Sequence, residues 1–407
     1  MTGKFKISRA FFFELLICMI WIQTILMQYF RAALMRLPII GAFPDAVLTI
    51  CYIVVVILAL PKFKLNGRDF LFVLGVTAVF IFEFLFRGQD NPYLDAYFPS
   101  FLLLTLPLYL VGIAISFYEN REKLFFYIYM LSSLTIILNF IYKVIFGTPM
   151  DAVMSQYQGD MNLAYNLLPH CCLVAFYAAK KTNIFNVGLT VFSVIYISML
   201  GTRGAAAILL VNIAWNIIMG KNSKRMLFKI LILFGAMAVF VSSSLCNSLI
   251  MWMYEFAQKL GLSIRIFDKL LGGTQLGSSG RDILTERLLA SVNEHFLFGT
   301  GLCSDRMMVG IYAHNISIEL WVSFGLILGT VILMVLFGVF FRGYFCSKSI
   351  IDKGFLAMLM CSSFFKLFLS GTFMDERLLF ILIGACVGVL RKNKDNKVYV
   401  SIAKNCD

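Results

Sequence analysis

The sequence predicts an all-α, polytopic membrane protein that crosses the bilayer about twelve times. Of its 407 residues, 60% are hydrophobic and only 14% are charged, and the mean hydropathy is +0.86. Soluble globular domains have roughly one quarter charged residues, so a soluble protein could not bury this much apolar surface. The apolar runs are continuous over about 17–25 residues and do not alternate, which favours spanning helices over the strands of a barrel.

Twelve apolar segments with charged loops between them fit a single membrane domain over residues 1–407. The longest loop, residues 246–313, is the only one long enough for a small external subdomain. In this loop Leu284, Leu288 and Val292 recur every fourth residue, which predicts an amphipathic helix. The segments lie near residues 10–30, 43–60, 70–86, 99–117, 124–146, 163–179, 184–200, 204–220, 227–245, 316–341, 354–370 and 378–390.

Positive charges predict the orientation of these helices. Alternate loops carry most of the 35 Lys and Arg residues. The positive-inside rule places these loops and both termini in the cytoplasm, and an even number of helices agrees with that assignment. The basic regions are residues 4–9, 62–68, 121–123, 180–181, 221–229, 342–353 and 391–404.

Composition and motifs exclude several functions. The net charge of +13 is divided among loops that flank helices, and no nucleic-acid-binding motif accompanies it. The ten cysteines are scattered without metal-ligand spacing, so we expect no metal. P-loop, Rossmann, GxSxG and HExxH motifs are missing, which argues against an ATP-driven pump, a dehydrogenase, a serine hydrolase and a zincin. We therefore expect no cofactor.

Arginines on the outer side are candidate anion-binding residues. Arg203 lies in a Gly-Thr-Arg-Gly-Ala turn between two apolar helices, and it is either a snorkelling interfacial side chain or a fixed cation for an anionic substrate. Arg281 begins the predicted amphipathic helix beside a glycine turn, where backbone N–H groups could complete an anion site. Arg287 has Asp282 and Glu286 nearby, and a structural ion pair is the simpler interpretation.

His314 is a candidate general base. It is one of three histidines in the chain and precedes Asn315 and a long predicted helix. A histidine at a helix end is usually structural. A helix N-terminus, however, disfavours the protonated imidazole and leaves a neutral ring that can accept a proton.

Acidic residues in the predicted spans are few, and Glu14, Glu83 and Glu319 are the main candidates. A proton-coupled transporter more often has carboxylates on facing helices, together with broken helices in two related halves. The sequence therefore gives a transporter little support.

The order of the motifs resembles that of the O-antigen ligase and O-antigen or capsular polysaccharide polymerase family of bacterial membrane glycosyltransferases. The resemblance covers roughly residues 156–330. The matching motifs are Gln-Gly-Asp-Met-Asn at 158–162, Gly-Thr-Arg-Gly-Ala at 201–205, Ser-Ser-Gly-Arg at 278–281, His-Phe-Leu-Phe-Gly-Thr-Gly at 295–301, and Ala-His-Asn at 313–315 followed by Gly325.

The resemblance implies a GT-C-like fold and a metal-independent, inverting transfer at the outer face of the bacterial cytoplasmic membrane. The donor would be an oligosaccharide on undecaprenyl pyrophosphate, held among membrane lipids. Arg203 and Arg281 would bind the pyrophosphate and stabilise its charge as it leaves. His314 would accept the proton of the acceptor hydroxyl, and Asn315 would orient the substrate.

Further substrate contacts implied by the resemblance are Asn162, Arg287 and an acidic residue of the last outer loop, either Asp375 or Glu376. Each of these acids could instead pair with Arg377.

A polymerase would use a second lipid-linked repeat unit as its acceptor, with a chain-length regulator as a further partner. A ligase would use the lipid A core of lipopolysaccharide. We favour a polymerase because polymerases are more varied and numerous. A lipid-linked oligosaccharide flippase or other transporter is the alternative from another class.

Overall fold

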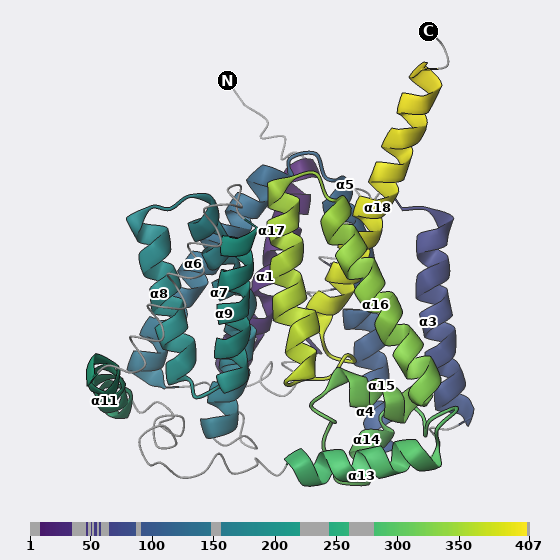
Figure 1. Ribbon diagram of the computed structural model, residues 1–407, viewed down its shortest axis with the longest axis horizontal. Helices are drawn as coiled ribbons and strands as arrows, with labels where there is room; N and C mark the ends of the chain where they lie inside the picture. Colours follow the sequence, from purple (N-terminus) through teal and green to yellow (C-terminus); the bar gives the residue numbers. More distant parts are fainter. Residues whose placement is uncertain are drawn as a thin grey trace. The chain divides into compact units, whose positions relative to one another are not determined.

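The computed structural model describes residues 9–34, 65–86, 91–147, 156–219, 244–259 and 281–404, with a few isolated positions between 46 and 57. All regular secondary structure in these ranges is helical, which confirms the predicted class (Figure 1). The predicted segments at 43–60 and 227–245 lie largely outside the described residues. Among the described helices, four are long and apolar enough to cross a membrane: Gly67–Phe86, Pro92–Phe117, Arg121–Phe146 and Leu326–Cys346.

The chain divides into two compact units. Unit 1 comprises Met1–Leu16, Thr49–Leu124 and Ser278–Asp407, and unit 2 comprises Ile17–Leu48 and Phe125–Gly277. The division near residue 277 falls inside the predicted external loop, so the two parts of that loop belong to different units.

Unit 2 is a helical bundle in which α7 packs against both α8 and α9. Its interior contains polar contacts: the Ser132 hydroxyl lies 3.0 Å from Trp21 Nε1 and 3.0 Å from His170 Nδ1. His170 is therefore a buried structural histidine of α7. The helices are the C-terminal part of α1 (Arg9–Leu34), most of α6 (Arg121–Phe146), α7 (Gln156–Lys180), α8 (Ile184–Met199), α9 (Arg203–Ile218) and α11 (Ser244–Lys259).

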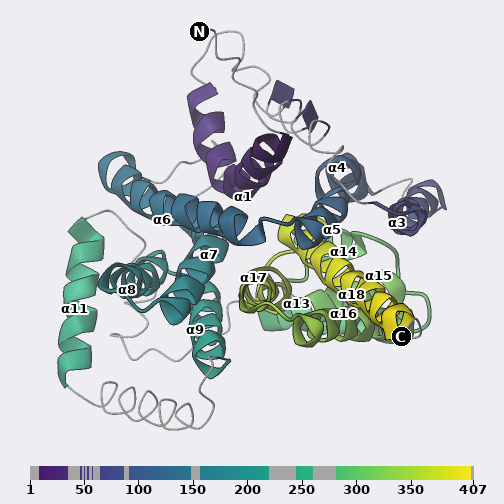
Figure 2. The ribbon, with the colours of Figure 1, turned by 90° about the horizontal axis from the view of Figure 1, so that it is seen from above.

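Unit 1 is organised around α18, which packs against α5, α16 and α17 (Figure 2). A π-helical turn, Phe101–Thr105, joins α4 to α5 between Pro99 and Pro107. The helices of the unit are α3 (Gly67–Phe86), α4 (Pro92–Ser100), α5 (Leu108–Phe117), α13 (Arg281–Glu294), α14 (Ser304–Val309), α15 (Ile316–Phe324), α16 (Leu326–Cys346), α17 (Ile350–Leu359) and α18 (Arg377–Lys404).

Glycines allow the backbones of α5 and α18 to touch. A Cβ atom on Gly384 would overlap the carbonyl oxygen of Tyr109, and one on Gly388 would overlap the Ser116 hydroxyl. The two glycines are four residues apart and so lie on one face of α18. Small residues in this spacing are typical of helix contacts in membranes, where close van der Waals packing drives association.

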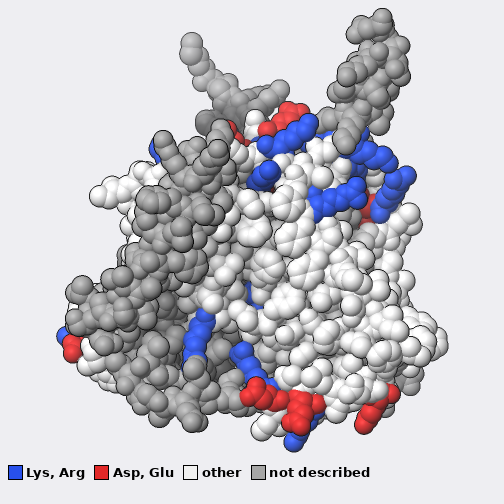
Figure 3. Space-filling model, viewed as in Figure 1, with Lys and Arg blue, Asp and Glu red and all other residues white. Residues whose placement is uncertain are grey.

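The loops of unit 1 gather at two ends. At the basic end, Arg391 of α18 donates to Asp69 of α3 over 2.8 Å, and Arg121 pairs with Asp352 of α17. Figure 3 shows Lys and Arg side chains gathered at this end, where α16 and α17 meet. At the opposite end lie α13, α14 and α15 (Figure 1). Among the described residues of unit 1, therefore, those of the predicted cytoplasmic regions near 68, 121, 352 and 391 share one end.

The prediction of one continuous helix over residues 316–341 is wrong, because the structure has two helices there, α15 and α16. Gly325 has φ +82° and separates α15 from α16. The Leu326 N–H leaves the helical ladder and donates to the Phe296 carbonyl over 2.9 Å. A Cβ on Gly325 would overlap the carbonyl of Leu297, so only glycine fits this contact.

Replacement of Gly384 by Ala should destabilise unit 1, because the added methyl overlaps the backbone of α5 and forces the helices apart. Overpacking of this kind costs about 1–3 kcal/mol in the free energy of unfolding. The midpoint of unfolding in detergent measures the effect. Gly338→Ala in α16 is the matched control, because a Cβ at that position meets no atom within 4 Å. Equal midpoints for the two variants would contradict the close contact.

Candidate functional site

The amphipathic helix predicted in the external loop is confirmed, and it positions Arg281. Helix α13 begins at Arg281. Its buried residues Leu288 and Val292 pack against Ile318 and Val322 of α15. This apolar contact holds α13 against α15. Arg281, at the start of α13, therefore lies near residues 313–315, which lead into α15.

Arg281 and Asn315 converge on two consecutive backbone carbonyls. Arg281 Nη1 donates to the carbonyl of Leu369 over 3.0 Å. Asn315 Nδ2 makes a longer contact of 3.5 Å with the carbonyl of Phe368. His314 precedes Asn315, so three of the predicted site residues, Arg281, His314 and Asn315, lie together at this end of unit 1.

His314 adopts a backbone conformation that is unusual for a residue with a side chain. Its φ is +56°, in the left-handed region, where non-glycine residues are uncommon and often mark functional sites. Asn315 then caps α15 by accepting the N–H of Ser317 over 2.9 Å. His314 therefore lies directly before the residue that caps α15, which is the position near a helix N-terminus that the sequence predicts.

The His314 imidazole is half-buried and neutral near pH 7. Burial and the positive charge of Arg281 lower its pKa from 6.5 to about 4. Its ring centroid lies 4.2 Å from that of Tyr312. Within the described part of the chain, its Nδ1 is a buried atom without a hydrogen-bond partner. Because Nδ1 is buried, Nε2 is the ring nitrogen that we expect to meet a ligand.

The two acids of the last predicted outer loop differ in their surroundings. Glu376 is buried and forms an ion pair with Lys366. Burial raises the pKa of Glu376, and the Lys366 charge opposes that rise. Asp375 is exposed. Asp375 is therefore the acid of this loop that a ligand could reach.

Arg287 lies on α13 with its side chain exposed. The ion pair expected with Asp282 or Glu286 does not form among the residues that the structure describes.

Arg203 and Asn162 belong to unit 2. Helix α8 ends at Met199 and α9 begins at Arg203, which confirms the tight turn, and the arginine side chain is exposed. Asn162 lies inside α7, so the polar motif at 158–162 is part of that helix. Asp160 of the same motif is buried and pairs with Lys143 over 2.8 Å.

The glycine motif at residues 295–301 has a structural explanation. The Thr300 N–H donates to the carbonyl of Val322 over 2.8 Å. Gly299 has φ +62°, and a Cβ there would lie 2.5 Å from the same Val322 oxygen. The motif therefore packs backbone to backbone on the C-terminal end of α15 and supports the helix that follows His314.

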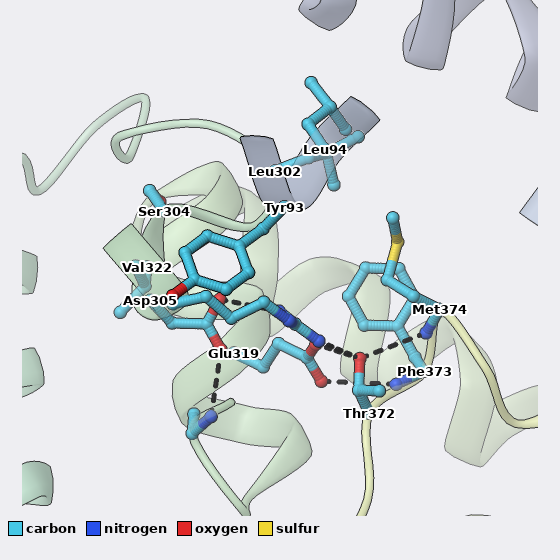
Figure 4. Close-up of polar contacts among 12 residues, drawn as sticks. Tyr93, Leu94, Leu302, Ser304, Asp305, Glu319, Val322, Thr372, Phe373 and Met374 are labelled. Atoms are coloured by element: carbon cyan, nitrogen blue, oxygen red, sulfur yellow. Dashed lines mark hydrogen bonds and ion pairs between the residues drawn. The ribbon is translucent and has the colours of Figure 1, made fainter. Parts of the chain in front are cut away.

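A buried charge network beneath the site was missed by the sequence analysis. Arg306 of α14 is 2% exposed and donates to Asp305 Oδ1 over 2.7 Å, to Glu319 Oε1 over 3.3 Å and to Thr372 Oγ1 over 2.6 Å. Its guanidinium also lies 4.8 Å from the ring centroid of Tyr97. Figure 4 shows Asp305, Glu319 and Thr372 pointing toward one another from three segments. The signal was Glu319 itself, since an acid in an apolar helix requires a cation.

The other two acids of the predicted spans also have partners in unit 1. Glu14 accepts from the Tyr118 hydroxyl over 2.7 Å and from Lys123 over 3.3 Å. Glu83 accepts the N–H of Leu302 over 3.3 Å. Both carboxylates thus link segments of unit 1.

Neither a protein-family model nor a curated protein matches this chain. Among the described residues, no group of three His, Cys, Asp or Glu side chains could hold a metal ion.

Removal of the Arg281 charge should raise the pKa of His314 above about 4, because the cation no longer opposes protonation of the ring, while burial still holds the pKa below 6.5. Titration of ¹³C-labelled histidine by NMR in micelles measures this shift, and His314→Gln assigns the signal among three histidines. Arg281→Gln is the test, and Arg287→Gln on the same helix is its control. Identical His314 titrations in Arg281→Gln and the unaltered protein would show that the two side chains do not interact.

Proposed function

We propose that the chain is a polysaccharide polymerase of the bacterial cytoplasmic membrane. It transfers an O-antigen or capsule repeat unit from undecaprenyl pyrophosphate to an acceptor sugar hydroxyl. The proposal includes the GT-C-like arrangement, about twelve spans, cytoplasmic termini and an outward-facing site. The observation that carries it is the convergence of Arg281, His314 and Asn315 at the end of unit 1 opposite the basic loops.

The donor would bind to Arg281 through its pyrophosphate. A guanidinium can hold two phosphate oxygens at once and stabilise the charge that develops as the lipid pyrophosphate leaves. Pyrophosphate is a good leaving group, so no general acid is required. Arg203, at the exposed start of α9, is assigned the same role on the sequence resemblance.

The acceptor would lose its proton to His314. The ring is neutral near pH 7, and Nε2 is the nitrogen left for a hydroxyl. A pKa of about 4 makes a weak base. An anionic donor on Arg281 would offset the positive charge that lowers this pKa, so donor binding would strengthen the base. Attack on the face opposite the leaving group inverts the anomeric carbon.

A ligase would use the same residues with the lipid A core as acceptor. A flippase or transporter predicts instead that function survives the loss of Arg203, Arg281 and His314 one at a time. The partnered states of Glu14, Glu83 and Glu319 favour the enzyme, because a proton carrier needs carboxylates that can change partners.

The His314→Ala variant should lose turnover but keep its affinity for the donor. Loss of a general base lowers turnover about 10²–10⁴-fold, while donor affinity, which depends on the arginines, should change little. Arg281→Lys keeps the charge but loses the bidentate contact and should weaken donor binding. Purified protein with a lipid-pyrophosphate oligosaccharide allows both quantities to be measured in one preparation.

The controls for these variants are His295→Ala, which alters an exposed histidine near the site, and Arg342→Lys, which alters an exposed arginine of α16. Both should retain donor binding and turnover. If His314→Ala kept most of its turnover, or lost donor affinity in proportion to activity, His314 would not be the base.

A further inference from the structure

The Arg306 network ends on backbone groups of the two segments that form the candidate site. Asp305 Oδ2 accepts the N–H of Ala313, directly before His314, over 2.9 Å. Glu319 Oε2 accepts the N–H of Phe373 over 3.2 Å. Thr372 Oγ1 accepts from the Met374 N–H over 3.3 Å and donates to Glu319. The network therefore holds the segment before α15 and the segment that follows the Phe368 and Leu369 carbonyls.

His314 lies between two anchored neighbours. On one side, Ala313 is held by Asp305. On the other, Asn315 caps α15, the helix that carries Glu319. A left-handed backbone at a non-glycine residue costs of order 1–3 kcal/mol and persists only where its surroundings impose it. The contacts at Ala313 and Asn315 are such surroundings.

Stability alone does not require this network. Apolar residues of similar volume often replace a buried ion pair without loss of stability, because two charges are costly to remove from water. The bonds of Asp305, Glu319 and Thr372 instead end on three backbone N–H groups. Hydrogen bonds depend on direction, so a network of this kind defines backbone positions more precisely than apolar packing does.

We propose that Arg306, with Asp305, Glu319 and Thr372, is a positioning network that holds His314 in its left-handed conformation beside Arg281 for proton transfer. None of the four residues needs to touch the substrate. The catalytic part of this inference rests on the proposed function. The geometric part, that the network sets the position of the His314 ring, does not.

Thr372→Val and Thr372→Ser test the network with nearly constant volume. Val removes the oxygen that accepts from Arg306 and Met374 and donates to Glu319, whereas Ser keeps it. A misplacement of about 1 Å can cost roughly 100-fold in rate. We therefore expect kcat to fall about 10–100-fold in Thr372→Val with the KM for donor nearly unchanged, and to recover in Thr372→Ser.

The position of the ring is measured separately by NMR titration of His314, whose ring faces Arg281 and Tyr312. In Thr372→Val the pKa of His314 should rise, because the ring is no longer held beside the Arg281 charge. In Thr372→Ser the pKa should return to the value of the unaltered protein. If Thr372→Val fails to fold, Arg306→Lys tests the same bonds, with Arg121→Lys as the control for loss of an arginine at the basic end. The control should leave kcat and the titration unchanged.

Two results would overturn the inference. One is a His314 titration that Thr372→Val and Arg306→Lys leave unchanged. The other is an equal loss of activity in Thr372→Ser and Thr372→Val, which a general loss of packing would give. An inactive unaltered protein would instead refute the proposed function, and the titration would then decide the geometric claim by itself.

Discussion

The buried charge of Arg306 is the constraint on which the site end of unit 1 depends. A guanidinium that is 2% exposed is tolerated only if anions and hydrogen-bond acceptors surround it. Asp305 and Glu319 supply the anions from α14 and α15, and Thr372 supplies a hydroxyl from the segment before α18. The bonds to this one cation thus join the neighbouring helices α14 and α15 to a segment 66 residues further along the chain.

The contacts around this network explain why the site forms where the apolar helices end. Gly325 ends α15 and separates it from α16. The glycine motif at 295–301 and the residues beside it form backbone hydrogen bonds to both sides of this break. Helix α13 packs on α15 and presents Arg281. The consecutive carbonyls of Phe368 and Leu369 then receive Asn315 and Arg281. Each contact joins only a few neighbouring residues. Together these contacts place the Arg281 cation and the neutral His314 imidazole at one end of the unit.

The helical class, the start of α13 at Arg281 and the turn before Arg203 could be predicted, because hydropathy, four-residue periodicity and glycine positions are local signals. The Arg306 network could not, because Thr372 lies 66 residues from Arg306 in the sequence and only the fold brings the two side chains together. The break at Gly325 was hidden for a similar reason: a glycine in an apolar run is tolerated in a helix, and this helix ends because Gly325 has a positive φ and the Leu326 N–H bonds to the carbonyl of Phe296.

Incubation of the purified protein with a lipid-pyrophosphate-linked repeat unit as the sole sugar substrate is the most direct test of glycosyl transfer between repeat units. Mass spectrometry of the lipid-linked products and NMR of the new linkage are the measurements. Polymerisation predicts two or more repeat units on one lipid, one undecaprenyl pyrophosphate released for each new bond, and inverted anomeric configuration. Recovery of the donor unchanged, or its transfer between the leaflets of a vesicle without a new glycosidic bond, would contradict the proposed function.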